Sequence, residues 1–175
     1  MENVIEVESL QKDYGNGIFM REASFQLKDV SFTVPKGYIT GLIGPNGAGK
    51  TTIIKLIMDL VRRNGGTIKV FGLDNIGHGV EIKDRIGFVY DTPYFYEDQS
   101  LKTLMRAIGP FYSRWNETQC LSLFERFGLS PNKKFSSLSK GMKTKFALAL
   151  ALSHDADLIV MDEPTSGLDP IFRRE

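Results

Sequence analysis

The first third of the chain alternates apolar and polar residues with a period of two. The alternation runs through residues 5–10, 25–27 and 30–34, and turn-forming residues at 15–17 and 35–37 interrupt it. A period of two is typical of strands with one buried face. We therefore predict a small antiparallel β-sheet in this region.

The next segment predicts a strand, a loop and a helix. Residues 38–43 form a short apolar run that leads into a glycine-rich loop, and residues 50–62 then carry apolar side chains at helical intervals. Asn-Gly-Gly at 64–66 is a helix stop signal. A further strand is predicted over residues 67–71.

From about residue 98 to residue 153 the apolar spacing is helical. Gly-Pro at 109–110 and Ser-Pro-Asn at 130–132 divide this segment into separate helices. The unbroken apolar run at 158–161 predicts a strand buried on both faces of a parallel sheet. The order of elements predicts an α/β protein.

Composition and charge fit a globular domain. The 175 residues are 42% hydrophobic and 25% charged, and the formal net charge is +1, which argues against a general attraction to nucleic acid. The single cysteine, Cys120, allows no internal disulfide and favours a reducing compartment. No apolar run approaches the roughly 20 residues that a spanning helix needs, and the first residues lack a signal-peptide pattern. At a membrane the protein would therefore be held by another polypeptide.

Residues 44–51 fit the pattern G-x-x-x-x-G-K-[ST] between a predicted strand and a predicted helix. Glycines let successive N–H groups point inward, and the helix adds its positive N-terminal end. Lys50 is expected to reach the β- and γ-phosphates of a nucleotide, Thr51 to ligate Mg²⁺, and Thr52 to assist. The rest of this phosphate loop consists of Gly44, Pro45, Asn46, Gly47, Ala48 and Gly49. The alternative is a glycine-rich turn without a ligand.

Two acidic residues follow the predicted strand at 158–161. Ligands bind at the carboxyl ends of parallel strands, so Asp162 is expected to hold Mg²⁺. Glu163 points elsewhere and is expected to act as the general base on an attacking water. The alternative, a solvated acidic turn closed by Pro164, loses weight beside the phosphate loop.

These motifs, in this order, resemble those of the ABC ATPases. The match includes the phosphate loop, residues 138–142, residues 158–164 and residues 166–169. The resemblance implies a P-loop NTPase core with a mainly parallel sheet, an N-terminal antiparallel β-subdomain and an inserted α-helical subdomain. Residues 1–97 are then expected to form the β-subdomain and P-loop core, 98–153 the helical subdomain and 154–175 the return to the core. The resemblance also implies ATP and Mg²⁺ as cofactors.

Residues 138–142, Leu-Ser-Lys-Gly-Met, resemble the signature motif of that family, usually Leu-Ser-Gly-Gly-Gln. Ser139 is a favourable N-cap, and the helix start could hold an anion on Ser139 and the Gly141 N–H. In the family this end faces the γ-phosphate held by a second subunit, and two subunits pack head to tail around two ATP molecules. Lys140 replaces a glycine and Met142 a glutamine; Lys140 either adds positive charge or hinders the partner. The alternative is a plain helix cap.

Two further positions are assigned by the resemblance. Asp91 stands where the family usually has glutamine, and its carboxylate could contact Mg²⁺ or the attacking water; an acid here resembles the exporter-type branch. The alternative is an ordinary loop acid. Tyr14 is the expected partner of the adenine ring, and Phe19 and Phe25 are rivals.

The C-terminal part resembles the family less completely. Residues 166–169 resemble the D-loop, in which Asp169 would link the two sites, although a simple capped turn is the alternative. The family continues to a switch histidine, so we expect this chain to be truncated and its own hydrolysis to be poor. His154 is predicted to be a surface histidine that stabilises a helix C-terminus.

The sequence therefore predicts the ATP-binding and hydrolysing subunit of an ABC transporter, acting in export. Its expected partners are a transmembrane permease subunit and a second ATPase subunit, either identical or paralogous, with no nucleic acid. It is expected to be cytoplasmic and bound peripherally, through the permease subunit, at the inner face of the cell membrane. One alternative is a soluble ABC-type ATPase acting on ribosomes or DNA. Another, an unrelated P-loop kinase or GTPase, leaves residues 138–142 and the acidic pair unexplained.

Overall fold

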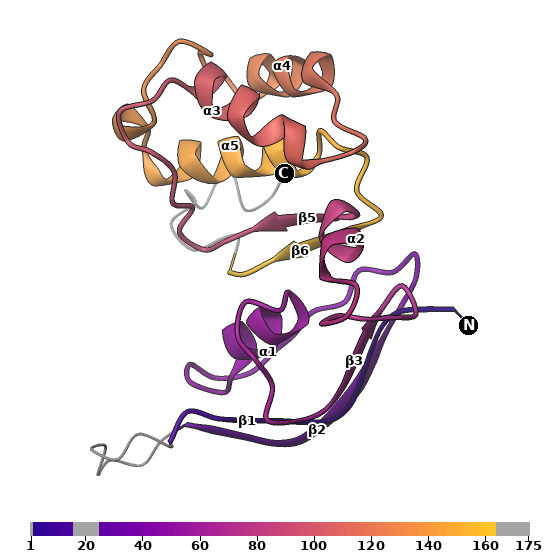
Figure 1. The fold of residues 1–175 in the computed structure, drawn as a ribbon. Helices are drawn as coiled ribbons and strands as arrows, with labels where there is room; N and C mark the ends of the chain where they lie inside the picture. Colours follow the sequence, from indigo (N-terminus) through magenta and orange to yellow (C-terminus); the bar gives the residue numbers. More distant parts are fainter. Residues whose placement is uncertain (1, 16–24, 164–175) are drawn as a thin grey trace. The chain divides into compact units, whose positions relative to one another are not determined.

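The computed structural model describes residues 2–15 and 25–163 of the chain (Figure 1). The backbone clusters into two compact units, Met1–Lys83 and Asp84–Glu175. The P-loop belongs to the first unit, and the signature motif and acidic pair belong to the second. The subdomain bounds expected at residues 97 and 153 stay a prediction.

The first unit contains a curved antiparallel sheet in the order β2-β1-β3-β4 (Figure 1). Its strands are β1 (Asn3–Asp13), β2 (Gln26–Pro35), β3 (Gly65–Val70) and β4 (Leu73–Asp74). Val7 of β1 lies opposite Phe32 on one side and Ile68 on the other. Val7, Leu10 and Ile68 are buried. Val7 and Leu10 are three residues apart, so the register shift between them, where Ser9 has a φ of 46°, interrupts the period of two. The predicted antiparallel sheet is confirmed.

The helix after the P-loop, α1 (Lys50–Ile57), is shorter than the predicted span of residues 50–62. Asp59 has a φ of 49°, and its N–H donates to the carbonyl of Leu56 at 3.1 Å. The Leu60 N–H donates to the carbonyl of Lys55 at 2.8 Å. These two bonds form a Schellman motif, which ends the helix. The sequence did not reveal this end because an aspartate occupies the left-handed position that glycine usually takes.

The strand predicted over residues 38–43 is wrong. Residues 38–45 form neither helix nor strand, and the side chains of Ile39 and Ile43 are exposed. A strand is stable only when a neighbour pairs with its backbone groups. Among the described residues, no strand pairs with this segment. The first unit ends with the short helix α2 (Gly79–Asp84).

The second unit combines a parallel strand pair with a helical layer. β5 (Ile86–Val89) and β6 (Leu158–Met161) pair in parallel, with Ile86 opposite Leu158. Between them the chain forms α3 (Leu101–Ile108), η1 (Gly109–Phe111), α4 (Glu117–Arg126), η2 (Phe135–Ser137) and α5 (Lys140–Ala151). The predicted helices and the parallel strand are confirmed. The expectation that β6 is buried on both faces is wrong, because Met161 is 39% exposed and β6 pairs only with β5 in the described part of the chain.

An aromatic core holds the helical layer together. Phe124, Phe135 and Phe146 are fully buried. The ring of Phe95, from the segment after β5, meets Phe135 and Phe146 edge to face, each at a centroid distance of 5.2 Å. Because α5 carries Phe146 and also lies over β5 (Figure 1), this core fixes α5 relative to the strand pair.

His154 is not a surface residue, which corrects the prediction. It follows α5 as expected, but its side chain is fully buried. Its Nδ1 lies 3.3 Å from the carbonyl oxygen of Leu150, its Nε2 lies 3.2 Å from that of Ile86, and the Tyr112 ring stacks on it at 3.9 Å. The neutral imidazole can donate its one N–H to one of these two carbonyls, and the stacked Tyr112 ring adds packing that favours its burial. His154 therefore links the end of α5 to the start of β5.

Candidate functional site

The P-loop is curled in a way that requires glycine. The Ala48 N–H donates to the Pro45 carbonyl at 3.2 Å, and Gly47 and Gly49 have φ values of 82° and 93°. Residues other than glycine rarely adopt such φ angles. The Lys50 ammonium folds back over the loop and donates to the carbonyls of Gly44 and Pro45 at 3.0 and 3.1 Å. The sequence-predicted residues 44–52 therefore form one local structure.

The start of α1 favours an anion. Gly49 is the N-cap and provides no side-chain hydrogen bond, and the first turn holds no acidic residue. The first N–H groups of a helix have no partner within the helix, and the helix dipole makes this end positive. Thr51 and Thr52 lie in this first turn, directly after Lys50. The arrangement presents a positive, donor-rich end beside the curled loop.

An aromatic pair lies next to the P-loop. A Cβ atom built on Gly49 would lie 2.6 Å from Cζ of Phe25, so the Phe25 ring packs directly on this glycine. The Tyr14 and Phe25 ring centroids are 6.4 Å apart, and Tyr14 is 45% exposed. Tyr14 and Phe25 are thus both available beside the loop, and Phe19 lies outside the described residues. Which ring contacts a base stays a prediction.

In the second unit, the two acidic residues after β6 differ in environment. The Asp162 N–H donates to the Val89 carbonyl at 2.9 Å, which extends the parallel ladder, and Asp162 is only 6% exposed. Glu163 is exposed and has a φ of 46°. Burial and the nearby charge of Asp162 raise the pKa of Tyr90. One carboxylate is therefore enclosed at the strand end and the next faces solvent, and the roles predicted for Asp162 and Glu163 stay predictions.

The signature segment forms the predicted helix cap. Ser139 has extended backbone angles, and its Oγ accepts a hydrogen bond from the Met142 N–H at 3.3 Å. The first turn of α5, which includes Gly141, contains no acidic residue. The cap is confirmed, and the phosphate-binding roles of Ser139 and Gly141 stay a prediction.

One contact was not predicted. The Lys140 Nζ lies 3.2 Å from Oδ1 of Asp91, so two of the residues that depart from the family pattern form an ion pair. The sequence gave one indication of this ion pair, because Lys140 and Asp91 carry opposite charges. Neither residue alone indicated the other, because 49 positions separate them along the chain.

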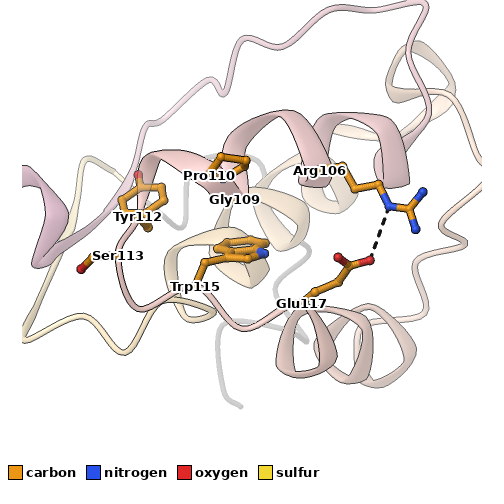
Figure 2. A pocket seen from close by; sticks show the side chains of 7 residues that line it. All are labelled: Arg106, Gly109, Pro110, Tyr112, Ser113, Trp115 and Glu117. Atoms are coloured by element: carbon orange, nitrogen blue, oxygen red, sulfur yellow. Dashed lines mark hydrogen bonds and ion pairs between the residues drawn. The ribbon is translucent and has the colours of Figure 1, made fainter.

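A cavity of about 290 Å³ in the helical layer contains none of the predicted site residues. Figure 2 shows the Trp115 indole beside Gly109 and the ion pair of Arg106 with Glu117, 3.5 Å between Nε and Oε1. A Cβ atom built on Gly109 would lie 2.6 Å from the Trp115 ring nitrogen, so Trp115 can pack there only against glycine. The cavity is lined by Arg106, Gly109, Pro110, Tyr112, Ser113, Trp115 and Glu117.

Within residues 2–15 and 25–163, no group of three or more His, Cys, Asp or Glu side chains is arranged to hold a metal ion. The assignment of Thr51, Asp91 and Asp162 to Mg²⁺ therefore stays a prediction that also needs oxygen ligands from the nucleotide and water. No helix in the same residues is both long and apolar enough to cross a bilayer. The predicted D-loop, with Asp169, lies outside the described residues.

The curled glycine loop, its lysine and the uncapped helix start define a P-loop nucleotide-binding protein. The family model described as ABC transporter matches residues 27–166. The chain therefore belongs to the ABC transporter ATP-binding family, as the motif order indicated.

Individual relatives agree with this assignment. The chain is 38% identical over 149 residues to the ABC transporter ATP-binding protein NatA of Bacillus subtilis (strain 168), covering 82% of this chain and 61% of the relative. A solved ATP-binding subunit of an ABC transporter matches with a TM-score of 0.83 at 29% identity, covering 98% of this chain and 70% of that one.

A third match shows the fold alone. It is an ATP-binding cassette solved as a dimer in a post-hydrolysis state with ADP and Pi, with a TM-score of 0.81 at 22% identity, covering 95% of this chain and 77% of that one. The chain spans about half to three fifths of the length of the first curated relatives. These structural matches confirm the P-loop NTPase fold.

Proposed function

We propose that this protein binds and hydrolyses MgATP as the ATPase subunit of an ABC transporter. The observation that carries the proposal is the P-loop, in which Lys50, two glycines with positive φ and a helix start without a side-chain cap lie together. ATP is the expected nucleotide because the family and the named relatives are ATP-binding proteins. The names of these relatives specify a transporter, which favours this role over that of an ATPase acting on ribosomes or DNA.

The proposed roles of the residues follow their environments. Lys50 and the loop N–H groups hold the phosphates, and Tyr14 stacks on the adenine. Thr51, Asp162 and Asp91 hold Mg²⁺, which supplies charge neutralisation for phosphoryl transfer. The exposed Glu163 orients and deprotonates the attacking water. Asp162, at the carboxyl end of β6, contributes its side-chain oxygens to this site.

A second ATPase subunit completes each site in this proposal. The Ser139-capped start of α5 faces the γ-phosphate held by the other subunit, and the two subunits are identical or paralogous. The dimeric cassette with ADP and Pi supports this arrangement at the level of fold. ATP-driven closure and reopening then move a permease subunit at the inner face of the cell membrane, in the direction of export.

The P-loop role is tested with Lys50→Ala. Loss of a charge-assisted contact with the phosphates costs about 1.5–3 kcal/mol, so the Kd for MgATP should rise roughly 10- to 100-fold. The matched control is Lys55→Ala, one turn further along α1, which removes the same charge from the last turn. Unchanged affinity in Lys50→Ala, measured by calorimetry, would refute the assignment.

A further inference from the structure

The segment that follows β5 is held against the start of α5 by two ion pairs. Asp91 Oδ1 lies 3.2 Å from Lys140 Nζ, and Glu97 Oε1 lies 3.0 Å from Lys143 Nζ. The segment contributes both carboxylates, and the helix contributes both ammonium groups. All of these residues belong to the second compact unit.

The middle and far end of the segment are fixed by other means. The Phe95 ring is packed against Phe135 and Phe146. The N–H groups of Ser136 and Phe135 donate to the carbonyls of Glu97 and Gln99, each at 3.0 Å. At the end nearest to β5, Asp91 contacts α5 through Lys140.

Lys140 occupies an electrostatically unfavourable place on its own helix. It is the first residue of α5, where the helix dipole is positive and an acidic residue would be favourable. The first turn offers no acidic residue that could compensate. Asp91 supplies a compensating charge. A lysine here therefore gains a contact with the segment after β5.

We propose that Lys140 is a positioning residue for Asp91: the ion pair holds the segment after β5, with the Asp91 carboxylate, on the first turn of the signature helix. The ion pair therefore couples the motion of α5 to that of Asp91, the residue proposed to contact Mg²⁺ or the attacking water. This role rests on the proposed ATPase function, but the ion pair itself is testable without nucleotide.

Hydrogen exchange of residues 92–99, measured by mass spectrometry on the nucleotide-free protein, tests the positioning. Exposed ion pairs contribute little, so Lys140→Gln and Asp91→Asn should each speed exchange by roughly two- to threefold. The double variant should be no faster than either single variant, because both remove the same contact. Lys140→Arg should retain wild-type exchange. Lys134→Gln, which removes a lysine from the same unit, serves as the control and should also retain wild-type exchange.

Lys140→Glu separates positioning from helix stability. Glutamate at this place favours α5 through the helix dipole but repels Asp91. Positioning predicts faster exchange in residues 92–99 and a lower kcat at saturating MgATP, with the nucleotide affinity of the P-loop unchanged. Wild-type exchange in Lys140→Glu, or an unchanged kcat, would overturn the proposal. Failure of the wild-type protein to bind MgATP, with the exchange changes as expected, would instead count against the proposed function.

Discussion

Gly49→Ala tests whether the P-loop geometry and the aromatic pair beside it are coupled. Gly49 has a φ of 93°, and a Cβ atom there would lie 2.6 Å from Phe25 Cζ and 3.3 Å from Leu27 Cδ1. The substitution therefore introduces two separate penalties. The first is backbone strain, and the second is overlap with the Phe25 ring.

The two penalties have different sizes. A residue other than glycine at such a φ costs about 1–3 kcal/mol. Overpacking costs about 1–3 kcal/mol, and the lower end applies because the far end of the half-buried Phe25 ring can partly move away. We expect Gly49→Ala to lower the free energy of unfolding by about 2–4 kcal/mol in total.

Gly47→Ala is the matched control. Gly47 has a φ of 82°, but a Cβ atom there would meet nothing within 4 Å. It should cost only the backbone strain, so urea unfolding of the two variants should differ by the overlap with Phe25, about 1 kcal/mol. In a Phe25→Leu background that difference should shrink to the smaller remainder left by the Leu27 contact.

The reasoning would be refuted if Gly49→Ala were no less stable than Gly47→Ala. It would also be refuted if the difference between them were undiminished in the Phe25→Leu background. Either result would mean that Phe25 does not pack on Gly49 beside the P-loop.

Two further predictions concern titratable groups. Hydrogen bonding from Arg85, with a contribution from Arg114, lowers the pKa of Asp157 below its usual 3.8. This stabilisation is fully present above pH 3.8 and is lost as the pH falls through the lower folded pKa. Asp157→Asn should therefore cost about 0.5–1 kcal/mol in urea unfolding at pH 6 and nothing once both states are protonated; a pH-independent cost would contradict this. Burial raises the pKa of the Cys120 thiol to about 11, so iodoacetamide at pH 8 should modify Cys120 in urea but not in the folded protein. Equal rates in both conditions would show that Cys120 is exposed.

Local patterns predicted much of the fold. The period-two alternation located β1 and β2, and the helical spacing with its Gly-Pro and Ser-Pro-Asn breaks located α3, α4 and α5. The Ser139 cap was predictable because capping depends on residues three positions apart. These features depend on short stretches of chain.

Features that depend on distant residues were missed. The apolar run at 38–43 was read as a strand, yet strand formation depends on a partner that the run itself does not encode. His154 was placed at the surface because the sequence cannot show that the Ile86 carbonyl and the Tyr112 ring lie beside it. The end of α1 at an aspartate with positive φ departs from the usual glycine signal.

The sequence predicted the motifs of the candidate site better than it predicted the contacts between distant residues. The residues of the P-loop are adjacent in sequence, so their common structure followed from the pattern. The ion pair of Asp91 with Lys140 joins two segments that the tertiary fold brings together, and the packing of Phe25 on Gly49 likewise joins residues far apart in sequence. Charge and size at single positions could not reveal these contacts.

The most direct test of the central claim is the behaviour of Glu163→Gln with MgATP. If ATP is held by the P-loop of one subunit and enclosed by the Ser139 helix of another, this variant should bind ATP with near-normal affinity but lose turnover. Gel filtration should then show an ATP-dependent dimer that retains unhydrolysed nucleotide. Turnover at the wild-type rate, or a protein that stays monomeric with ATP bound, would contradict the account.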